Sequence, residues 1–159
     1  MGRVAASDHG DPWRLERFVA AQDRAGSYQR AVAELRAGAK SSHWMWFVFP
    51  QVAGLGASAM SRQYAISGAA EARAYLAHPV LGPRLRECAG IVAGTEGRPA
   101  EAIFGPVDAV KLRSSMTLFA AAAGPGGGGA ADVFSAVLAK FFDGEPDEET
   151  ITRLLLLVT

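Results

Sequence analysis

The chain contains the stretch His43-Trp44-Met45-Trp46-Phe47-Val48-Phe49-Pro50-Gln51, whose middle is an unbroken apolar run from Trp44 to Phe49. A segment that is apolar on every side is expected at the centre of a fold, so we predict that this run is buried. Pro50 ends it. A run of this length fits either a strand or a helix. We favour a helix, because the segments on both sides of it have helical patterns.

Two helices are predicted before this stretch. Asp11 precedes a proline, which is a favourable helix start, and the apolar spacing then predicts a helix over residues 13–24. Gln22 lies in the middle of the apolar stripe of that helix. We predict that Ser27 caps a second helix and that Gly38 ends it. The two helices are expected to form an antiparallel pair.

The segments that follow residue 51 are also predicted to be helical. Ser58 is expected to cap a short helix, Gly105 to break the chain before a longer helix over 107–123, and Asp147 to cap the last helix. Other predicted helices cover residues 69–78, the stripe Leu81, Leu85, Cys88 and Val92, and residues 100–104. A further helix has Val133, Phe134, Val137, Leu138 and Phe141 facing inward, and the last helix contains Ile151, Leu154 and Leu155. Residues 124–129 are rich in glycine and predict a loop.

These patterns predict an all-α fold. We expect a flexible tail over residues 1–10 and one compact domain of about seven to nine helices over residues 11–159. The chain has no long alternating pattern typical of strands and no internal repeat at a solenoid period.

Composition excludes several classes of protein. Half of the 159 residues are hydrophobic and 20% are charged, which is not typical of a disordered chain. The 16 Lys and Arg residues are balanced by 16 Asp and Glu residues, so we expect no nucleic-acid polymer as a partner. The apolar runs are far shorter than the ~18 residues of a membrane span. A single cysteine and an N-terminus without an apolar signal region favour the cytoplasm, whereas the oligomeric state is left open.

Motifs for metal and cofactor chemistry are missing. The sequence has no phosphate-binding loop, zinc-protease helix or paired-cysteine motif, and its histidines, His9, His43 and His78, are scattered. The glycines at 54 and 56 fit a dinucleotide-binding fingerprint only formally, because no strand is expected directly before them. We therefore predict no metal site and no bound cofactor.

The stretch around the apolar run carries the first group of candidate binding residues. Lys40, His43, Trp44, Trp46 and Gln51 place a cation, an imidazole, two indoles and an amide within twelve residues. Indole faces between polar side chains are typical of a pocket for a planar ring. The alternative is that both tryptophans belong to the core.

The predicted 107–123 helix carries a second group. Lys111, Ser114 and Ser115 share one side of this helix, and Asp108 lies one turn earlier. One ammonium and two hydroxyls could bind a phosphate or a ribose, or this side could simply face solvent. Gln22 is either a buried amide bonded to the backbone or a further ligand contact.

Several motifs resemble a known family. They are Arg17-Phe18, Ala21-Gln22, Tyr28 with Ala31, residues 43–51, Gly54-Leu55-Gly56, Tyr64-Ala65-Ile66, residues 74–82, Ile103-Phe104-Gly105 and residues 111–119. Together they look like the bacterial domain-of-unknown-function family numbered 1810, over about residues 13–155. This resemblance implies a small, mainly helical domain without an assigned activity, and it adds Tyr64 to the candidate binding residues. Some members carry the label calpastatin, which no motif of this sequence supports.

A more distant resemblance is to the NADAR domains, helical proteins linked to ADP-ribose derivatives and to N-glycosidic cleavage. The shared pattern is a helix with Lys and Met, then a Phe-rich helix and a Leu-rich C-terminal helix. It implies a nucleotide-like ligand. For cleavage of an N-glycosidic bond, Asp108 is our candidate catalytic residue, because an acidic group could orient the water or stabilise an oxocarbenium ion. The alternative function is a non-enzymatic interaction or structural domain. The two hypotheses differ in whether Lys111, Ser114, His43 and Gln51 meet in one pocket.

Overall fold

The computed structural model describes residues 10–124 and 129–158 of the chain. These residues form the helices α2 to α10 and no strand, which confirms the predicted all-α fold. The one β-type contact among them is an isolated parallel bridge between Val52 and Ile66. The predicted tail, apart from Gly10, and residues 125–128 of the glycine-rich loop lie outside the described residues, whereas Gly129 is the first residue of α9.

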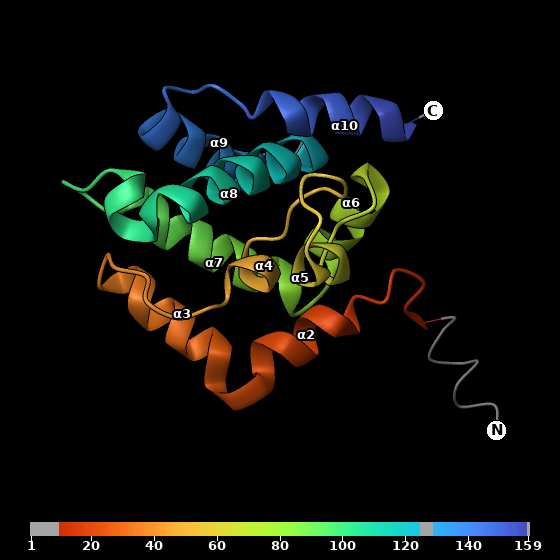
Figure 1. Cartoon of the computed structure of the whole chain (residues 1–159), viewed down its shortest axis with the longest axis horizontal. Helices are drawn as coiled ribbons and strands as arrows, with labels where there is room; N and C mark the ends of the chain where they lie inside the picture. The colour runs from red at the N-terminus through yellow and green to blue at the C-terminus, as the bar shows by residue number, and fades with distance from the viewer. Residues whose placement is uncertain (1–9, 125–128, 159) are drawn as a thin grey trace.

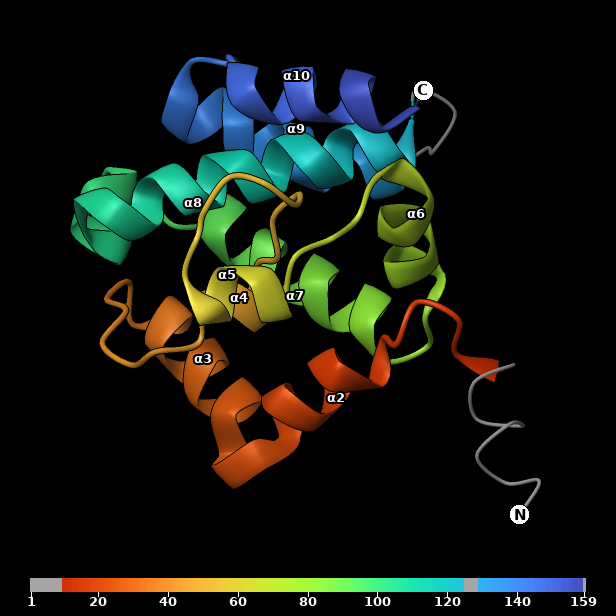
Figure 2. The same ribbon diagram turned by 45° about the vertical axis from the view of Figure 1, so that its right-hand side comes forward.

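The helices form layers (Figures 1 and 2). In chain order they are α2 (Glu16–Asp23), the 3-10 turn η1 (Arg24–Gly26), α3 (Ser27–Arg36), α4 (Met45–Val48), α5 (Ala59–Gln63), α6 (Ala69–Ala77), α7 (Leu81–Ala93), α8 (Ala100–Ala123), α9 (Gly129–Phe142) and α10 (Glu148–Val158). Helices α8, α9 and α10 lie along one side of the molecule, α7 lies beneath α8, and α2 and α3 lie on the opposite side. The short helices α4 and α5 lie between these groups.

The first two helices differ from the prediction in three ways. The Asp11 carboxylate accepts hydrogen bonds from the backbone N–H groups of Leu15 and Glu16, at 2.7 and 3.0 Å, so α2 begins later than expected. Ser27 does not cap α3, because its hydroxyl donates to the carbonyl of Arg24 and a left-handed glycine precedes it. The helices diverge as a V and are not antiparallel (Figure 1). Gly38, with a φ of 70°, ends the second helix region as predicted.

Helix α8 is the central element of the fold. It is interrupted at Gly105, whose φ of 83° and ψ of 161° are not helical, and the next residue is Pro106. This is the predicted break. Beyond it, all residues from Ser114 to Phe119 are buried, because α6, α9 and α10 pack against different sides of α8. The expectation that Ser115 lies on a polar side of this helix is therefore wrong.

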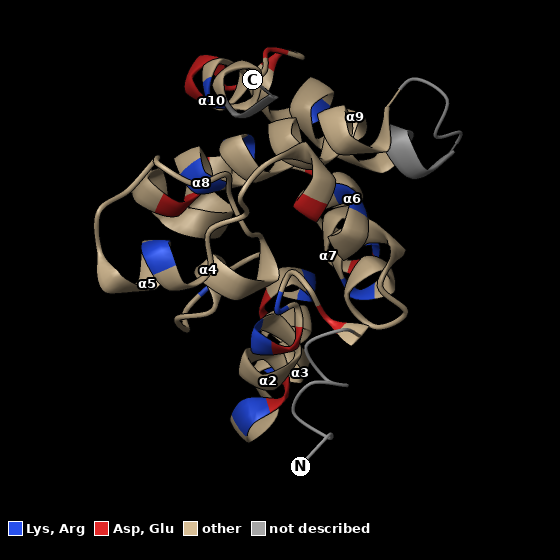
Figure 3. Cartoon of the chain, turned by 90° about the vertical axis from the view of Figure 1, so that its right-hand side faces the viewer, with Lys and Arg blue, Asp and Glu red and all other residues tan. Residues whose placement is uncertain are grey.

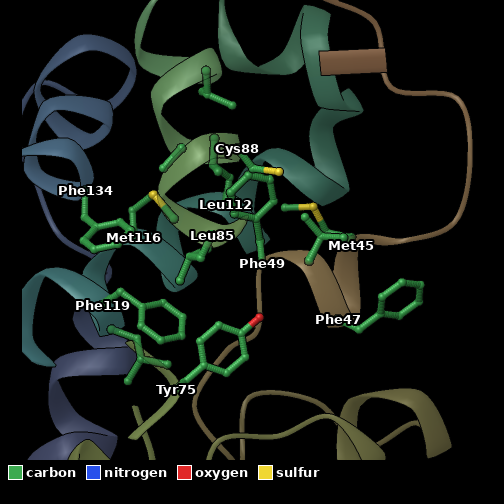
Figure 4. Packing of buried hydrophobic residues seen from close by; sticks show 14 of the residues in the cluster. Met45, Phe47, Phe49, Tyr75, Leu85, Cys88, Leu112, Met116, Phe119 and Phe134 are labelled. Carbon is green, nitrogen blue, oxygen red and sulfur yellow. The ribbon is translucent and has the colours of Figure 1, made fainter. Parts of the chain in front are cut away.

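The apolar run around α4 is central, as predicted. Trp44 and Phe49 are 1% and 0% exposed. Figure 4 shows Phe49 near Leu85 of α7 and Leu112 of α8, whereas Phe47 points to another side of the cluster. Trp46 is the exception in this run, because it is only partly buried.

The last helix is capped as predicted. The Asp147 carboxylate accepts hydrogen bonds from the backbone N–H and the hydroxyl of Thr150, at 2.9 and 2.6 Å. Leu154 is buried, whereas Leu155 is 67% exposed. Figure 3 shows that several helices, including α8 and α10, carry both basic and acidic residues.

None of the helices in the described part of the chain has the length and apolar content needed for a membrane span.

Candidate functional site

A cleft of about 640 Å³ opens between three parts of the chain. One side is the segment from α4 to α5, the second is the part of α8 that follows the Gly105 break, and the third is the start of α10. Its apolar wall consists of Trp46, Val52, Leu55, Pro106, Val107 and Val110. Among these, Val107 and Val110 are 67% and 61% exposed, so the wall on α8 is open to solvent.

Five of the candidate residues line this cleft together. They are Trp46, Gln51, Tyr64, Lys111 and Ser114. They come from α4, the loop after it, the end of α5 and α8, which are distant in sequence. The cleft therefore unites the two groups of candidate residues that the sequence placed in separate segments.

Lys111 and Trp46 form the contact between those segments. The Lys111 Nζ atom lies 5.0 Å from the centroid of the Trp46 ring, a cation–π distance. Ser114 is one turn further along α8, and its hydroxyl donates to the carbonyl of Val110 at 3.2 Å. The ammonium group is therefore held at the cleft wall and not extended into solvent.

Asp108 connects Lys111 to a second lysine. Its carboxylate lies 2.8 Å from Lys40 Nζ and 3.2 Å from Lys111 Nζ. Burial raises the pKa of Asp108, but the hydrogen bonds and charges of Lys40 and Lys111 outweigh this and lower its pKa overall. Two ammonium groups, those of Lys40 and Lys111, thus share the carboxylate of Asp108. Asp108 is not among the residues that line the cleft.

Lys40 and Trp44 lie behind the cleft wall. Lys40 Nζ is 5.0 Å from the Trp44 ring centroid, and the Trp44 indole N–H donates to Glu34 at 2.9 Å. Glu34 also accepts hydrogen bonds from the backbone of Ser41 and Ser42. This network holds the loop between α3 and α4. His43 in that loop is exposed and does not line the cleft.

Gln22 and Ser115 also lie outside the cleft. Gln22 is 1% exposed, and its amide nitrogen donates to the carbonyl of Phe47 at 2.8 Å and to the hydroxyl of Tyr75 at 3.2 Å. The Gln22 amide oxygen accepts from Arg84 at 3.2 Å. Ser115 is fully buried, and its hydroxyl has no hydrogen-bond partner among the described residues.

Gln51 differs from Gln22 in one respect. It is 8% exposed and lines the cleft, but its amide nitrogen has no hydrogen-bond partner within the described part of the chain. Its backbone carbonyl accepts from the N–H of Ile66 at 2.9 Å, next to the Val52–Ile66 bridge. The position of Gln51 is therefore set by the backbone and not by its side chain.

The acidic wall of the cleft was not predicted from the sequence. Asp147 and Glu149 line it from the start of α10, and Ser61 lines it from α5. Asp147 was predicted only as a helix cap, and Glu149 lies in an ordinary charged first turn. No local pattern indicates that Asp147 and Glu149 line the same cleft as Lys111, because this depends on how α10 packs on α8.

The glycine at position 54 brings α10 close to the loop of the cleft. Its φ is 95°, and a Cβ atom there would lie 2.9 Å from Arg153 Nη1. Arg153 Nε lies 3.0 Å from the Glu149 carboxylate. The Arg153 guanidinium group therefore lies between the loop at Gly54 and the acidic wall.

Among residues 10–124 and 129–158, no three His, Cys, Asp or Glu side chains are grouped as metal ligands.

Comparison with known proteins shows the family. Residues 12–154 match the family model described as Protein of unknown function (DUF1810). The chain belongs to this family. Among solved structures, this DUF1810 member is similar to the conserved hypothetical protein Rv1873 from Mycobacterium tuberculosis, with 52% identity and a TM-score of 0.84. The match covers 91% of this chain and 99% of the other. No curated protein matches the sequence significantly.

Proposed function

We propose that the cleft binds a small nucleotide-like ligand. The observation that carries this proposal is the meeting of the Lys111 ammonium group and the Trp46 ring in one cleft with apolar walls. Small-molecule sites usually have volumes of about 300–1,000 Å³, mostly apolar walls and a few polar groups that orient the ligand. The cleft has each of these properties.

The roles of the cleft residues follow from their chemistry. Lys111 is the contact for a phosphate or another anion, because its ammonium group is the one cation among the described residues that line the cleft. A planar ring would pack against the remaining surface of Trp46 and the valines of α8. The hydroxyls of Ser61 and Ser114 and the carboxylate of Glu149 are suited to the hydroxyls of a sugar.

An ADP-ribose derivative is the ligand to test first, because the distant resemblance to NADAR domains implies this class. The more specific proposal is that the protein also cleaves the N-glycosidic bond of this ligand. The sequence suggested Asp108 as the catalytic residue for this cleavage. A ligand in the cleft would meet Asp147 and Glu149 first, since these two residues line the wall. A carboxylate at this place could orient a water molecule or stabilise positive charge on the sugar ring.

Calorimetry tests the proposal directly. ADP-ribose, NAD and AMP are titrated into the wild-type protein, and at least one of them is expected to bind with a dissociation constant below one millimolar. Lys111→Met should weaken that binding at least tenfold. Lys140→Met is the matched control, because Lys140 pairs with Glu96 outside the cleft. Absence of binding by all three compounds at millimolar concentration would overturn the proposal, and chromatography of the mixtures tests for cleavage.

The alternative function is a docking surface for another protein. The exposure of Val107 and Val110 at the edge of the cleft is the observation that favours it. In that case Val110→Ser would abolish capture of a protein partner, and the nucleotides named above would not bind.

A further inference from the structure

The three tyrosines of the chain are all buried, but their hydroxyl groups differ in hydrogen bonding. The Tyr75 hydroxyl accepts from Gln22 Nε2 at 3.2 Å, and the Tyr28 hydroxyl donates to Glu87. The Tyr64 hydroxyl has no hydrogen bond among the described residues, although this side chain belongs to a residue that is only 6% exposed. A buried tyrosine usually has a partner for its hydroxyl, so Tyr64 requires an explanation.

The Tyr64 hydroxyl is open to the cleft. Unpartnered side-chain atoms that are closed to solvent occur in the described residues on Gln51, Arg86 and Ser115, and the hydroxyl of Tyr64 is not among them. Tyr64 lines the cleft, so this is the surface at which its hydroxyl reaches open space. A ligand in the cleft can therefore meet this group directly, in contrast to the amide nitrogen of Gln51.

The ring of Tyr64 is fixed without help from its hydroxyl. Its centroid lies 5.7 Å from that of the Phe18 ring and 5.6 Å from that of the Phe47 ring. The backbone N–H of Tyr64 donates to the carbonyl of Met60 at 3.2 Å, at the end of α5. A phenylalanine at this position would keep all three contacts, so the fold does not require the hydroxyl.

The serine hydroxyls of the cleft have already used their protons. Ser61 Oγ donates to the carbonyl of Ser58 at 2.8 Å, and Ser114 Oγ donates to the carbonyl of Val110 at 3.2 Å. Both serines line the cleft but offer a ligand only acceptor lone pairs. The O–H group of Tyr64 has no such acceptor among the described residues, so its proton is available to a ligand.

We infer that the Tyr64 hydroxyl donates a hydrogen bond to an oxygen of the ligand and anchors the ligand at the α5 side of the cleft. Lys111 offers its ammonium group from α8, on another side of the cleft. A ligand that satisfies both donors carries several oxygen acceptors, and anionic oxygens such as those of a phosphate are the strongest. This inference rests on the proposed function, because it assigns one contact within the proposed nucleotide site.

The substitution Tyr64→Phe tests this contact, because it removes a single oxygen atom. The probe is whichever of ADP-ribose, NAD and AMP binds the wild type most tightly in calorimetry. Tyr64→Phe should bind it about tenfold more weakly, which is typical for the loss of one hydrogen bond to a charged acceptor. Its thermal midpoint should be unchanged or higher, since the fold makes no use of the hydroxyl.

Tyr75→Phe is the matched control. It removes the same atom from a tyrosine whose hydroxyl is bonded to Gln22 in the core and does not line the cleft. This variant should have a lower thermal midpoint and should bind the probe as the wild type does. The two substitutions therefore have opposite effects on stability and binding.

Fluorine NMR of protein labelled with 3-fluorotyrosine supplies the second measurement. The resonance that is missing from Tyr64→Phe belongs to Tyr64, and the probe should shift this resonance while that of Tyr75 stays in place. Wild-type affinity or a lower midpoint of Tyr64→Phe, or an unmoved Tyr64 resonance, would overturn the inference and leave the nucleotide site standing. Absence of binding by ADP-ribose, NAD and AMP would overturn both proposals.

Discussion

Lys40 and Asp108 form an ion pair in which Nζ lies 2.8 Å from Oδ2, and this pair joins the loop before α4 to α8. The side chains are 7% and 22% exposed. Loss of one partner leaves a largely buried charge uncompensated. We expect Asp108→Asn to lower the free energy of unfolding by about 2 kcal/mol, less than for a fully buried pair. Urea denaturation measures this.

A surface ion pair is the control for that experiment. Glu96 pairs with Lys140 but its side chain is 83% exposed, so Glu96→Gln should change the free energy of unfolding much less than Asp108→Asn does. Asp108→Asn should also strengthen binding of an anion in the cleft, because it frees a second positive charge. Equal stability of the two variants would contradict the structural role of Asp108.

Gln22 is expected to be structural. Gln22→Leu removes the hydrogen-bond partners of the Phe47 carbonyl and the Tyr75 hydroxyl in the core, and it should cost about 2 kcal/mol or more. Thermal unfolding of Gln22→Leu and Gln51→Leu side by side gives the comparison. A larger loss of stability for Gln51→Leu than for Gln22→Leu would contradict the structural role of Gln22.

Glu34 should make stability depend on pH in the acid range. Burial raises its pKa, but hydrogen bonds from the side chains and backbone of Ser42, Ser41 and Trp44 outweigh this and lower it from 4.5 to about 2. A carboxylate whose pKa is lower in the folded state stabilises fully above the unfolded value and loses that contribution as the pH falls. Wild type should therefore exceed Glu34→Gln in melting temperature at pH 7, and the difference should shrink between about pH 4.5 and 2. A constant difference across this range would argue against the network.

Gly54 should tolerate alanine poorly. Its positive φ disfavours a side chain, and the added Cβ would lie against Arg153. We expect Gly54→Ala to cost more than Gly97→Ala, which has a φ of 76° but no atom within 4 Å of the added Cβ. Backbone strain alone is worth about 1–2 kcal/mol. In a double-mutant cycle, Gly54→Ala should destabilise the Arg153→Ala protein less than it destabilises the wild type. Additive effects would show that the two sites are independent.

Cys88 should be inert in the folded protein. It is fully buried, and burial raises the pKa of its thiol to about 12. Because the thiolate is the reactive form, alkylation by iodoacetamide at pH 8 should be negligible in native protein and complete in guanidinium. Rapid labelling of the native protein would contradict this burial.

Much of the fold could be predicted from the sequence, because apolar spacing along a helix is a local property. The stripe from Leu81 to Val92 lies buried on α7, Asp147 caps α10, and Gly105 interrupts α8. The errors occur where distant elements decide the outcome. Ser115 is on the predicted polar side of its helix, but α6, α9 and α10 pack against α8 and bury this residue.

The candidate site could be predicted only in part. Trp46, Gln51, Lys111 and Ser114 were found from their residue types, and they line one cleft. Glu149 and Ser61 were missed, because nothing in their local sequence distinguishes them from ordinary surface residues.

The helical class and the central position of the apolar run from Trp44 to Phe49 follow from local sequence, because both depend on the spacing and hydrophobicity of neighbouring residues. Which polar side chains meet depends on the tertiary structure. Gln22 and Gln51 have the same functional group, yet the packing of α2 against α4 supplies partners to the first, whereas the buried amide nitrogen of the second has no partner among the described residues. Hydrogen bonding between distant segments depends on their relative positions, and those positions are a property of the whole fold.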